Sequence, residues 1–427
     1  MQKKLTTELL NSLSDRFGNA FYLLESESFT QNYIELAEAF KAYYPKFNIA
    51  YSYKTNYTPK LVQIVDQLGG YAEVVSDMEM EVALRSGVSP SHIIWNGPVK
   101  NAKKVRELLL AGGTVNLDSI YEVNTIQRTA EENPGHLLNV GVRVNYDVGD
   151  GVLSRFGFDV DGEDFHTVLA FIASTPNLHL VNLQAHFAKR SPDFWTARAE
   201  GMLKVYDRVV QEYGLKPDRL DIGGGIFGKM PTSLRSQLGI GEISYDDYAS
   251  RAAKLFAEHF KNDPEAPYLF IEPGSAVAGD CMRFVSRIET IKTVRGKTIA
   301  TVTGSQKNIS MNGINPPMEL ISGGGAQENV ENCDIVGFTC IEGDVLQKDY
   351  TGKLGIGDYT VIGNCGSYSL VMKPPFILPN FPVLDICGDE VEVIKCAETF
   401  DNLFHTYCFN TLTGTGRERE REQICTS

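Results

Sequence analysis

Eight short apolar segments alternate with amphipathic stretches between residues 33 and 275, and this alternation constrains the fold more than any other feature. The stretches that precede or separate them, such as 33–44 and 103–113, carry apolar residues at helical spacing. Eight parallel strands, each followed by a helix, in about 240 residues predict a (β/α)8 TIM barrel, with a doubly wound open sheet as the alternative. The eight strand-like segments are 47–54, 71–76, 92–97, 113–118, 138–145, 180–187, 219–225 and 268–274.

The chain changes character after Gly274. Residues 276–427 contain further strand-like segments with frequent Gly and Pro and little helical periodicity, so they predict a separate β-domain. Residues 1–32 include a strand-like segment at 20–29, which we expect to join that β-domain. The charged segment 414–422 is interpreted as a solvated tail.

Composition excludes several classes of function. The net charge of −14 disfavours a nucleic-acid binder, which needs clustered Lys and Arg, and favours a small-molecule partner. We expect no membrane span, because no apolar run approaches roughly 18 residues, and we recognise no signal peptide. The 8 cysteines include no CxxC pair, so they predict neither a metal site nor a disulfide framework and favour a cytoplasmic protein.

Reactive residue types stand at the ends of four of the predicted strands, where barrel enzymes place their chemistry. These residues are Lys54, His186, the run Gly223, Gly224 and Gly225, and Glu272. Each alone is a weak signal, since a lysine after a strand is usually solvated and a lone histidine usually belongs to the core. Their coincidence at one end of one barrel predicts a single site.

These residue types suit a cofactor that carries an aldehyde, a phosphate and a pyridine ring. We expect burial to lower the pKa of Lys54, so that its amine can form a Schiff base with the aldehyde. Three successive glycines let backbone N–H groups approach a phosphate. Glu272 can keep the pyridine nitrogen protonated, which makes the ring an electron sink, and His186 can stack on the ring.

Six motifs occur in an order and spacing that resemble the barrel-type pyridoxal-phosphate decarboxylases, the family of diaminopimelate, ornithine and arginine decarboxylases. The resemblance covers nearly the whole chain. It implies an alanine-racemase-like barrel with a C-terminal β-sandwich or β-barrel domain, pyridoxal 5'-phosphate as the cofactor, an amino acid as the substrate and no metal. The motifs are AYSYKTN, AEVVSDMEME, LDIGGGIFG, IEPGS, FTCIEGDVL and GDYTVIGNCGSYS.

The resemblance also implies roles for the matched residues. Lys54 would carry the cofactor, His186 would stack on its ring and Glu272 would pair with the pyridine nitrogen. Tyr368 would reach the phosphate and Cys340 would return a proton after CO2 leaves, both in the neighbouring subunit of a head-to-tail homodimer. The residues around the phosphate would include Gly223, Gly224, Gly225, Gly274 and Ser275.

Three departures from the family pattern bear on the substrate. Ser275 replaces the arginine of the family motif EPGR, and 307–318 also lacks an arginine that diaminopimelate decarboxylases carry. The C-E-S-x-D motif becomes CIEGD, which moves the acidic residue by one place to Glu342. Asp344 either contacts the substrate amine or caps a turn. We therefore expect an amino acid other than standard diaminopimelate, with ornithine, lysine, arginine, a D-amino acid or a conjugated intermediate left open.

The third departure follows His186, where the family motif HxGSQ becomes HFAKR. Lys189 and Arg190 either replace the missing arginine at the phosphate or bind an acidic group of the substrate.

Two other functions compete with decarboxylation. A racemase of this barrel type tends to carry an arginine in place of Glu272, so the glutamate favours the carboxy-lyase. A non-catalytic homologue that acts through a protein partner typically loses the lysine or the cysteine, and both Lys54 and Cys340 are present.

Overall fold

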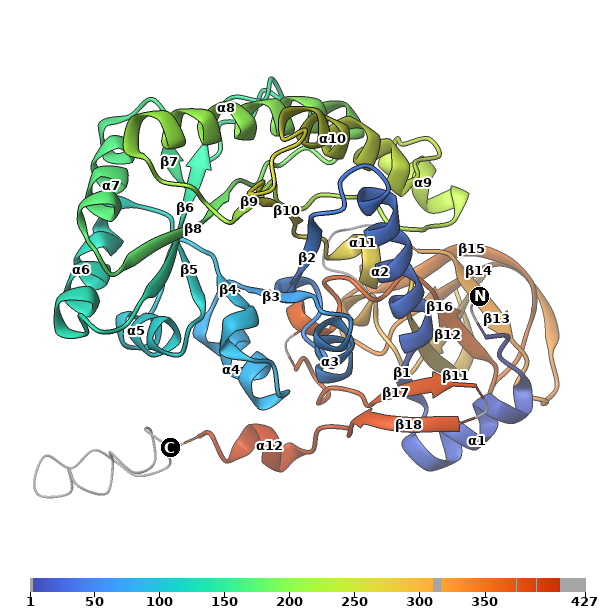
Figure 1. Ribbon diagram of the computed structural model, residues 1–427. Coiled ribbons are helices and arrows are strands. Elements are labelled where there is room, and N and C mark those ends of the chain that lie inside the picture. Colours follow the sequence, from blue (N-terminus) through green and yellow to red (C-terminus); the bar gives the residue numbers. More distant parts are fainter. Residues whose placement is uncertain (1–2, 310–315, 374, 389, 408–427) are drawn as a thin grey trace, which may run out of the picture.

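A computed structural model of the 427-residue chain describes residues 3–309, 316–373, 375–388 and 390–407. The predicted tail at 414–422 and part of the segment 307–318 lie outside the described residues. Figure 1 shows a barrel ringed by helices and a second, β-rich body packed against one side of it.

Eight parallel strands close into a barrel, because β10 pairs with β2 and β5 pairs with β6. This closure confirms the predicted TIM barrel and rules out the open sheet. Each predicted segment overlaps one barrel strand, since the apolar runs that define the segments form the wall. The strands are β2 (Phe47–Ser52), β3 (Tyr71–Val74), β4 (Ile93–Trp95), β5 (Thr114–Leu117), β6 (Leu138–Asn145), β8 (Leu178–Gln184), β9 (Arg219–Asp221) and β10 (Tyr268–Ile271).

Helices surround the barrel (Figure 1), and several begin at side-chain caps, as at Ser76, Asn101 and Ser244. No helix of the described residues is long and apolar enough to span a membrane. The helices between the barrel strands are α3 (Pro59–Gln67), α4 (Asp77–Arg85), α5 (Ala102–Leu110), α6 (Val123–Glu132), α7 (Glu163–Ser174), α8 (Trp195–Tyr213), α9 (Thr232–Leu238) and α10 (Tyr245–His259).

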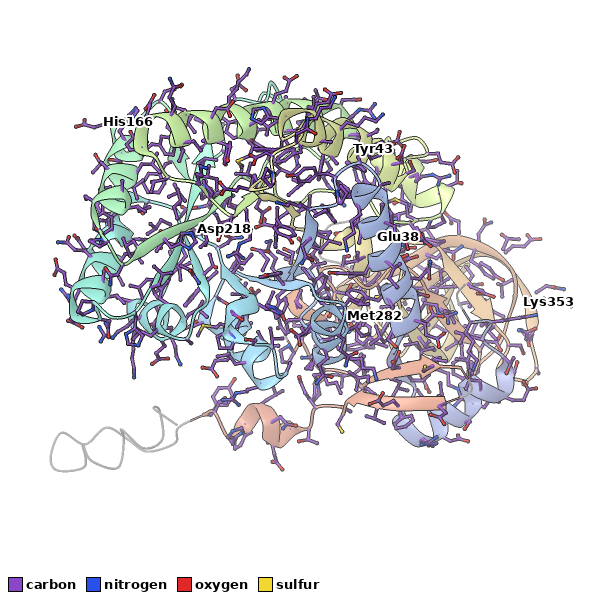
Figure 2. The ribbon with its side chains drawn as sticks, viewed as in Figure 1. Glu38, Tyr43, His166, Asp218, Met282 and Lys353 are labelled. Carbon is purple, nitrogen blue, oxygen red and sulfur yellow. The ribbon has the colours of Figure 1, made fainter. Side chains whose placement is uncertain are left out.

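One side of the barrel departs from the simple strand–helix repeat. The last strand is followed only by the short α11 (Ser275–Ala278), and α2 (Ser26–Lys41), which precedes the first strand, packs against α3, α10 and α11 there. Tyr43, labelled in Figure 2, donates a hydrogen bond of 2.7 Å to Asp246 of α10. Residue 33, the predicted start of the barrel, lies inside α2.

The β-domain is a mixed sheet formed from both ends of the chain. β1 lies between β11, antiparallel, and β17, parallel, so residues before the barrel join residues after it. Met282, labelled in Figure 2, is fully buried where the chain enters this sheet. The elements are α1 (Thr7–Phe17), β1 (Ala20–Leu24), β11 (Met282–Val294), β12 (Lys297–Val302), β13 (Met318–Ile321), β14 (Glu328–Val336), β15 (Val345–Leu354), β16 (Tyr359–Ile362), β17 (Val383–Cys387), β18 (Glu390–Lys395) and α12 (Phe400–Phe404), with the short β7 (Phe158–Asp159) beside β6 in the barrel.

Candidate active site

Lys54 lies in a single helical turn directly after β2, and its side chain is 37% exposed. Its Nζ donates to Glu73 Oε2 at 2.6 Å, and Glu73, on β3, is 1% exposed. Burial lowers the pKa of Lys54, but Glu73 and Glu272 together outweigh burial and raise it. The prediction that burial would lower the pKa of Lys54 is therefore wrong, because two carboxylates stabilise the ammonium form.

Glu272 lies directly after β10 and is buried. It accepts hydrogen bonds from Asn96 Nδ2 at 2.5 Å and from Gln184 Nε2, 3.1 Å from each of its oxygens. Burial raises the pKa of Glu272 well above its usual value, and Asp221 and Glu73 raise it further. Its carboxylate is therefore positioned by two amides in a region where negative charge is costly.

Asp221, at the end of β9, is fully buried and accepts the backbone N–H of Gly223 at 2.8 Å. Burial raises the pKa of this carboxyl to about 7. We call Glu73, Asp221 and Glu272 the acidic end of the site. The protonated nitrogen of a pyridine ring fits this cluster, because buried carboxylates are stable when a cation compensates them.

The glycine run lies between the ends of β8 and β10. Gly223 and Gly225 have φ values of +75° and +92°, in the left-handed region that favours glycine. A Cβ on Gly224 would lie 2.1 Å from the Glu272 carbonyl oxygen. His186 Nδ1 accepts the N–H of Gly224 at 3.0 Å, and burial lowers the pKa of His186 to about 3, so its ring is neutral. The run carries no side chains, so a phosphate can approach its backbone closely.

Tyr368 follows β16 and donates its backbone N–H to the carbonyl of Thr55 at 3.0 Å, directly beside Lys54. Tyr368 thus lies beside Lys54 of its own chain, whereas the resemblance implies a role in the neighbouring subunit. Thr55 Oγ1 and Ser367 Oγ are buried without a hydrogen-bond partner among the described residues. Gly274 has no room for a Cβ, which would lie 1.9 Å from Thr55 Oγ1. Two unpaired hydroxyls beside Lys54 and Tyr368 fit a polar ligand.

The remaining predicted residues lie in the β-domain, in the turn between β14 and β15. Cys340 and Glu342 are exposed, and within the described part of the chain neither has a hydrogen bond or ion pair with the barrel. Asp344 is 4% exposed and accepts from Ser305 Oγ at 3.0 Å and Thr339 Oγ1 at 2.6 Å. Of the two alternatives for Asp344, the hydrogen bonds favour the turn cap, because its carboxylate stabilises the turn that carries Cys340.

Glu73 and Gln184 were missed as site residues. A signal for Glu73 was present, because it is a charged residue in the middle of the apolar strand segment 71–76 and has to be paired where it is buried. Gln184 had no comparable signal, since an amide near a strand end is common.

The closed barrel carries a lysine, a carboxylate and a glycine run at its strand ends, and it is joined to a β-domain. This combination defines the class of barrel-type pyridoxal-phosphate enzymes. The model of the pyridoxal-dependent decarboxylase family, pyridoxal binding domain, matches residues 30–279, and the chain belongs to this family. It is accordingly a carboxy-lyase that acts on an amino acid with pyridoxal phosphate as its cofactor.

Relatives along nearly the whole length support this assignment. The diaminopimelate decarboxylase of Methanothermobacter thermautotrophicus is 25% identical over 408 residues, which cover 92% of each chain. A probable chloroplastic diaminopimelate decarboxylase of Oryza sativa is 27% identical, over 90% of this chain and 78% of that one. These names do not support the expectation that the substrate differs from diaminopimelate.

Solved structures show the same fold. Diaminopimelate decarboxylase from Helicobacter pylori, in complex with L-lysine, superposes with a TM-score of 0.76 at 21% identity, over 92% of this chain and 98% of that one. Lysine decarboxylase from Selenomonas ruminantium superposes with a TM-score of 0.68 at 21% identity, over 91% and 98%.

Proposed function

We propose that this enzyme removes one α-carboxylate of diaminopimelate as CO2. The observation that carries the decarboxylase proposal is the placement of Lys54 between Glu73 and Glu272 at the strand ends. The substrate is supported by the names of relatives that match 92% of the chain. The presence of Glu272 rather than an arginine favours decarboxylation over racemisation.

Several residues of this chain suit the cofactor. Bound pyridoxal phosphate supplies an electron sink for the electron pair left at the substrate Cα when CO2 departs. Lys54 would hold the cofactor, and Glu272 would keep a proton on the ring nitrogen because Asn96 and Gln184 orient its carboxylate. His186, which is neutral and bonded to the Gly224 N–H, would lie against the ring. The glycine run and Tyr368 would hold the phosphate.

The exposed turn of the β-domain suits a site shared between two copies of the chain. Cys340 and Glu342 are exposed on this turn, and Asp344 fixes its shape. In a head-to-tail homodimer, Cys340 returns a proton to Cα and Glu342 binds the distal ammonium group of the substrate. A substrate with a second amino group matches this negative charge.

The test of the reaction is CO2 release by cofactor-loaded enzyme across a panel of amino acids that includes meso-diaminopimelate, ornithine, lysine, arginine and D-amino acids. We expect the highest rate with meso-diaminopimelate and none with Lys54→Ala. Lys60→Ala, which removes an exposed amine paired with Glu392, is the matched control and keeps the wild-type rate. Release from another amino acid alone would overturn the substrate, and no release at all would overturn the reaction.

The shared site is tested by mixing two inactive variants, Lys54→Ala and Cys340→Ala. After subunit exchange, half of the dimers are mixed and each holds one intact site, so about a quarter of the wild-type activity returns. If no activity returns although exchange is verified by mass, Cys340 does not act in the neighbouring subunit.

A further inference from the structure

Arg198 of α8 is 0% exposed, although charged residues are rarely buried without a counter-charge. Its Nη1 donates to the Gly224 carbonyl at 2.7 Å, and its Nη2 donates to the carbonyls of Phe187, at 3.4 Å, and Lys189. Every partner is thus a neutral carbonyl, and among the described residues no carboxylate forms an ion pair with Arg198. Its Nε has no hydrogen-bond partner within the described residues. Arg198 is therefore a buried positive charge that no ion pair of the described residues compensates.

Arg190 is a second cation beside the glycine run, and it is half-buried rather than fully buried. Its Nη2 donates to the Ile226 carbonyl at 3.0 Å, and its guanidinium carbon lies 4.2 Å from the centre of the Phe227 ring. Tyr248 Oη donates to the Arg190 carbonyl at 3.0 Å and accepts the Phe227 N–H at 3.2 Å, which ties the two segments together. Arg190 also forms no ion pair within the described part of the chain.

Both guanidinium-bearing side chains flank the glycine run. A Cβ on Gly225 would lie 3.7 Å from Arg190 Cγ and 3.7 Å from Arg198 Nη2. Further along the same loop, a Cβ on Gly228 would lie 2.6 Å from the Ser275 carbonyl oxygen, so position 275 borders this loop as well. We call Arg190 and Arg198 the basic end of the site. Lys189 differs from both, because its side chain is exposed.

The charges of the two ends are opposite and complementary. Burial lowers the pKa of Arg198 to about 10 and also lowers the pKa of Arg190, yet Arg198 stays protonated at neutral pH. The basic end therefore needs an anion, as the acidic end needs a cation. Pyridoxal phosphate carries a cationic ring nitrogen and a phosphate at different ends of one molecule.

We propose that Arg190 binds the phosphate of pyridoxal phosphate directly, and that Arg198 is a positioning residue that holds the 187–189 loop and Gly224 around it. Together they replace the arginine that the family carries where this chain has Ser275. The inference rests on the cofactor and is independent of which amino acid is the substrate.

Binding of pyridoxal phosphate and of pyridoxal, which lacks the phosphate, separates this role from general stability. Absorbance titration of cofactor-free Arg190→Gln should show pyridoxal phosphate bound about 10- to 100-fold more weakly, with pyridoxal unchanged within twofold, because only the charged contact is lost. Lys204→Gln removes an exposed cation of α8 and is the charge-matched control, with both affinities unchanged. Equal losses for both ligands, or no loss, would overturn the role of Arg190.

A rescue variant sharpens the test. Ser275→Arg in the Arg190→Gln background should recover most of the affinity for pyridoxal phosphate, because position 275 borders the same loop. In phosphorus NMR of the bound cofactor, the phosphate signal should stay constant from about pH 6 to 8 in the wild type and titrate in Arg190→Gln. A signal identical in both proteins, with no rescue, would place Arg190 away from the phosphate.

Arg198 needs a conservative variant, because removing a buried side chain with three carbonyl partners can unfold the protein. The cofactor-free Arg198→Lys variant should stay folded. Its affinity for pyridoxal phosphate should fall more than its affinity for pyridoxal, so that the ratio of the two affinities changes at least fivefold. A lower melting temperature with an unchanged ratio would make Arg198 purely structural. None of these readouts requires turnover, so their failure is distinguishable from failure of the proposed reaction.

Discussion

The two ends of the site differ in charge and in the elements that form them. The acidic end, Glu73, Asp221 and Glu272, comes from three barrel strands or their immediate ends. The basic end, Arg190 and Arg198, comes from a loop and a helix outside the barrel wall. The pleat and register of a closed sheet fix where each strand residue lies, whereas loops and helices outside the sheet tolerate substitution of their residues. This difference explains how a cation absent at position 275 can be supplied from another element.

The two ends also share a feature: each holds charges that need a ligand of opposite charge. The carboxyl groups of Asp221 and Glu272 have raised pKa values, and Arg190 and Arg198 form no ion pair within the described residues, so these charges are costly in a cofactor-free protein. A single ligand with both charges relieves both costs. Three experiments test the acidic end, and the variants of Arg190 and Arg198 above test the basic end.

The largest effect is expected for Glu272→Gln. The amide keeps the size of the side chain but cannot hold a proton on the ring nitrogen, so kcat should fall about 1,000-fold while the cofactor stays bound. The measurement is steady-state CO2 release together with the absorbance of the bound cofactor. A fall of less than tenfold would show that the acidic end does not control the ring nitrogen.

A smaller effect, on the free energy of unfolding, is expected from the titration of Asp221 in the cofactor-free protein. Its pKa is raised from 3.8 to about 7, so between these values the folded state binds a proton that the unfolded state has lost. Stability is therefore greatest below about pH 4 for this group, and it falls by about 1.4 kcal/mol per pH unit as pH rises towards 7.

Urea unfolding from pH 5 to 7 measures this slope. The Asp221→Asn substitution should flatten the slope of the unfolding free energy against pH. Bound pyridoxal phosphate should flatten it too, because its ring cation lowers the pKa of Asp221. Glu79, whose pKa burial also raises to about 7, contributes a slope of the same sign that remains in the variant. A slope that is the same with and without the cofactor would contradict the charge assigned to this end.

The smallest effect is expected for Glu73→Gln. Loss of this carboxylate removes the hydrogen bond to Lys54 Nζ and one of the two charges that raise its pKa. The pKa of Lys54 should fall, so the pH profile for covalent attachment of the cofactor should move by about one unit towards lower pH. Borohydride trapping at a series of pH values measures the profile. A shift towards higher pH would contradict the role of Glu73.

Much of the fold followed from sequence periodicity, but the site followed only in part. The eight strand segments were found because apolar runs of strand length alternate with helical spacing, and Lys54, His186 and Glu272 were found at their ends. Arg198 was missed, although it stands at helical spacing with the buried Trp195 and Met202. A charge on the buried face of a helix is the available signal, and it is a weak one because charged residues are usually solvated.

The sequence by itself determined the barrel, the order of its strands and which residues stand at their ends, because local periodicity encodes each element and strand ends in a barrel converge. Only the tertiary structure decided the direction of the Lys54 pKa, the location of Tyr368 beside its own Lys54 and the burial of Arg198. Each depends on residues far apart in the chain: Lys54 is 218 positions from Glu272, the difference of the two residue numbers. Electrostatic environment is set by such long-range neighbours, and no local pattern encodes it.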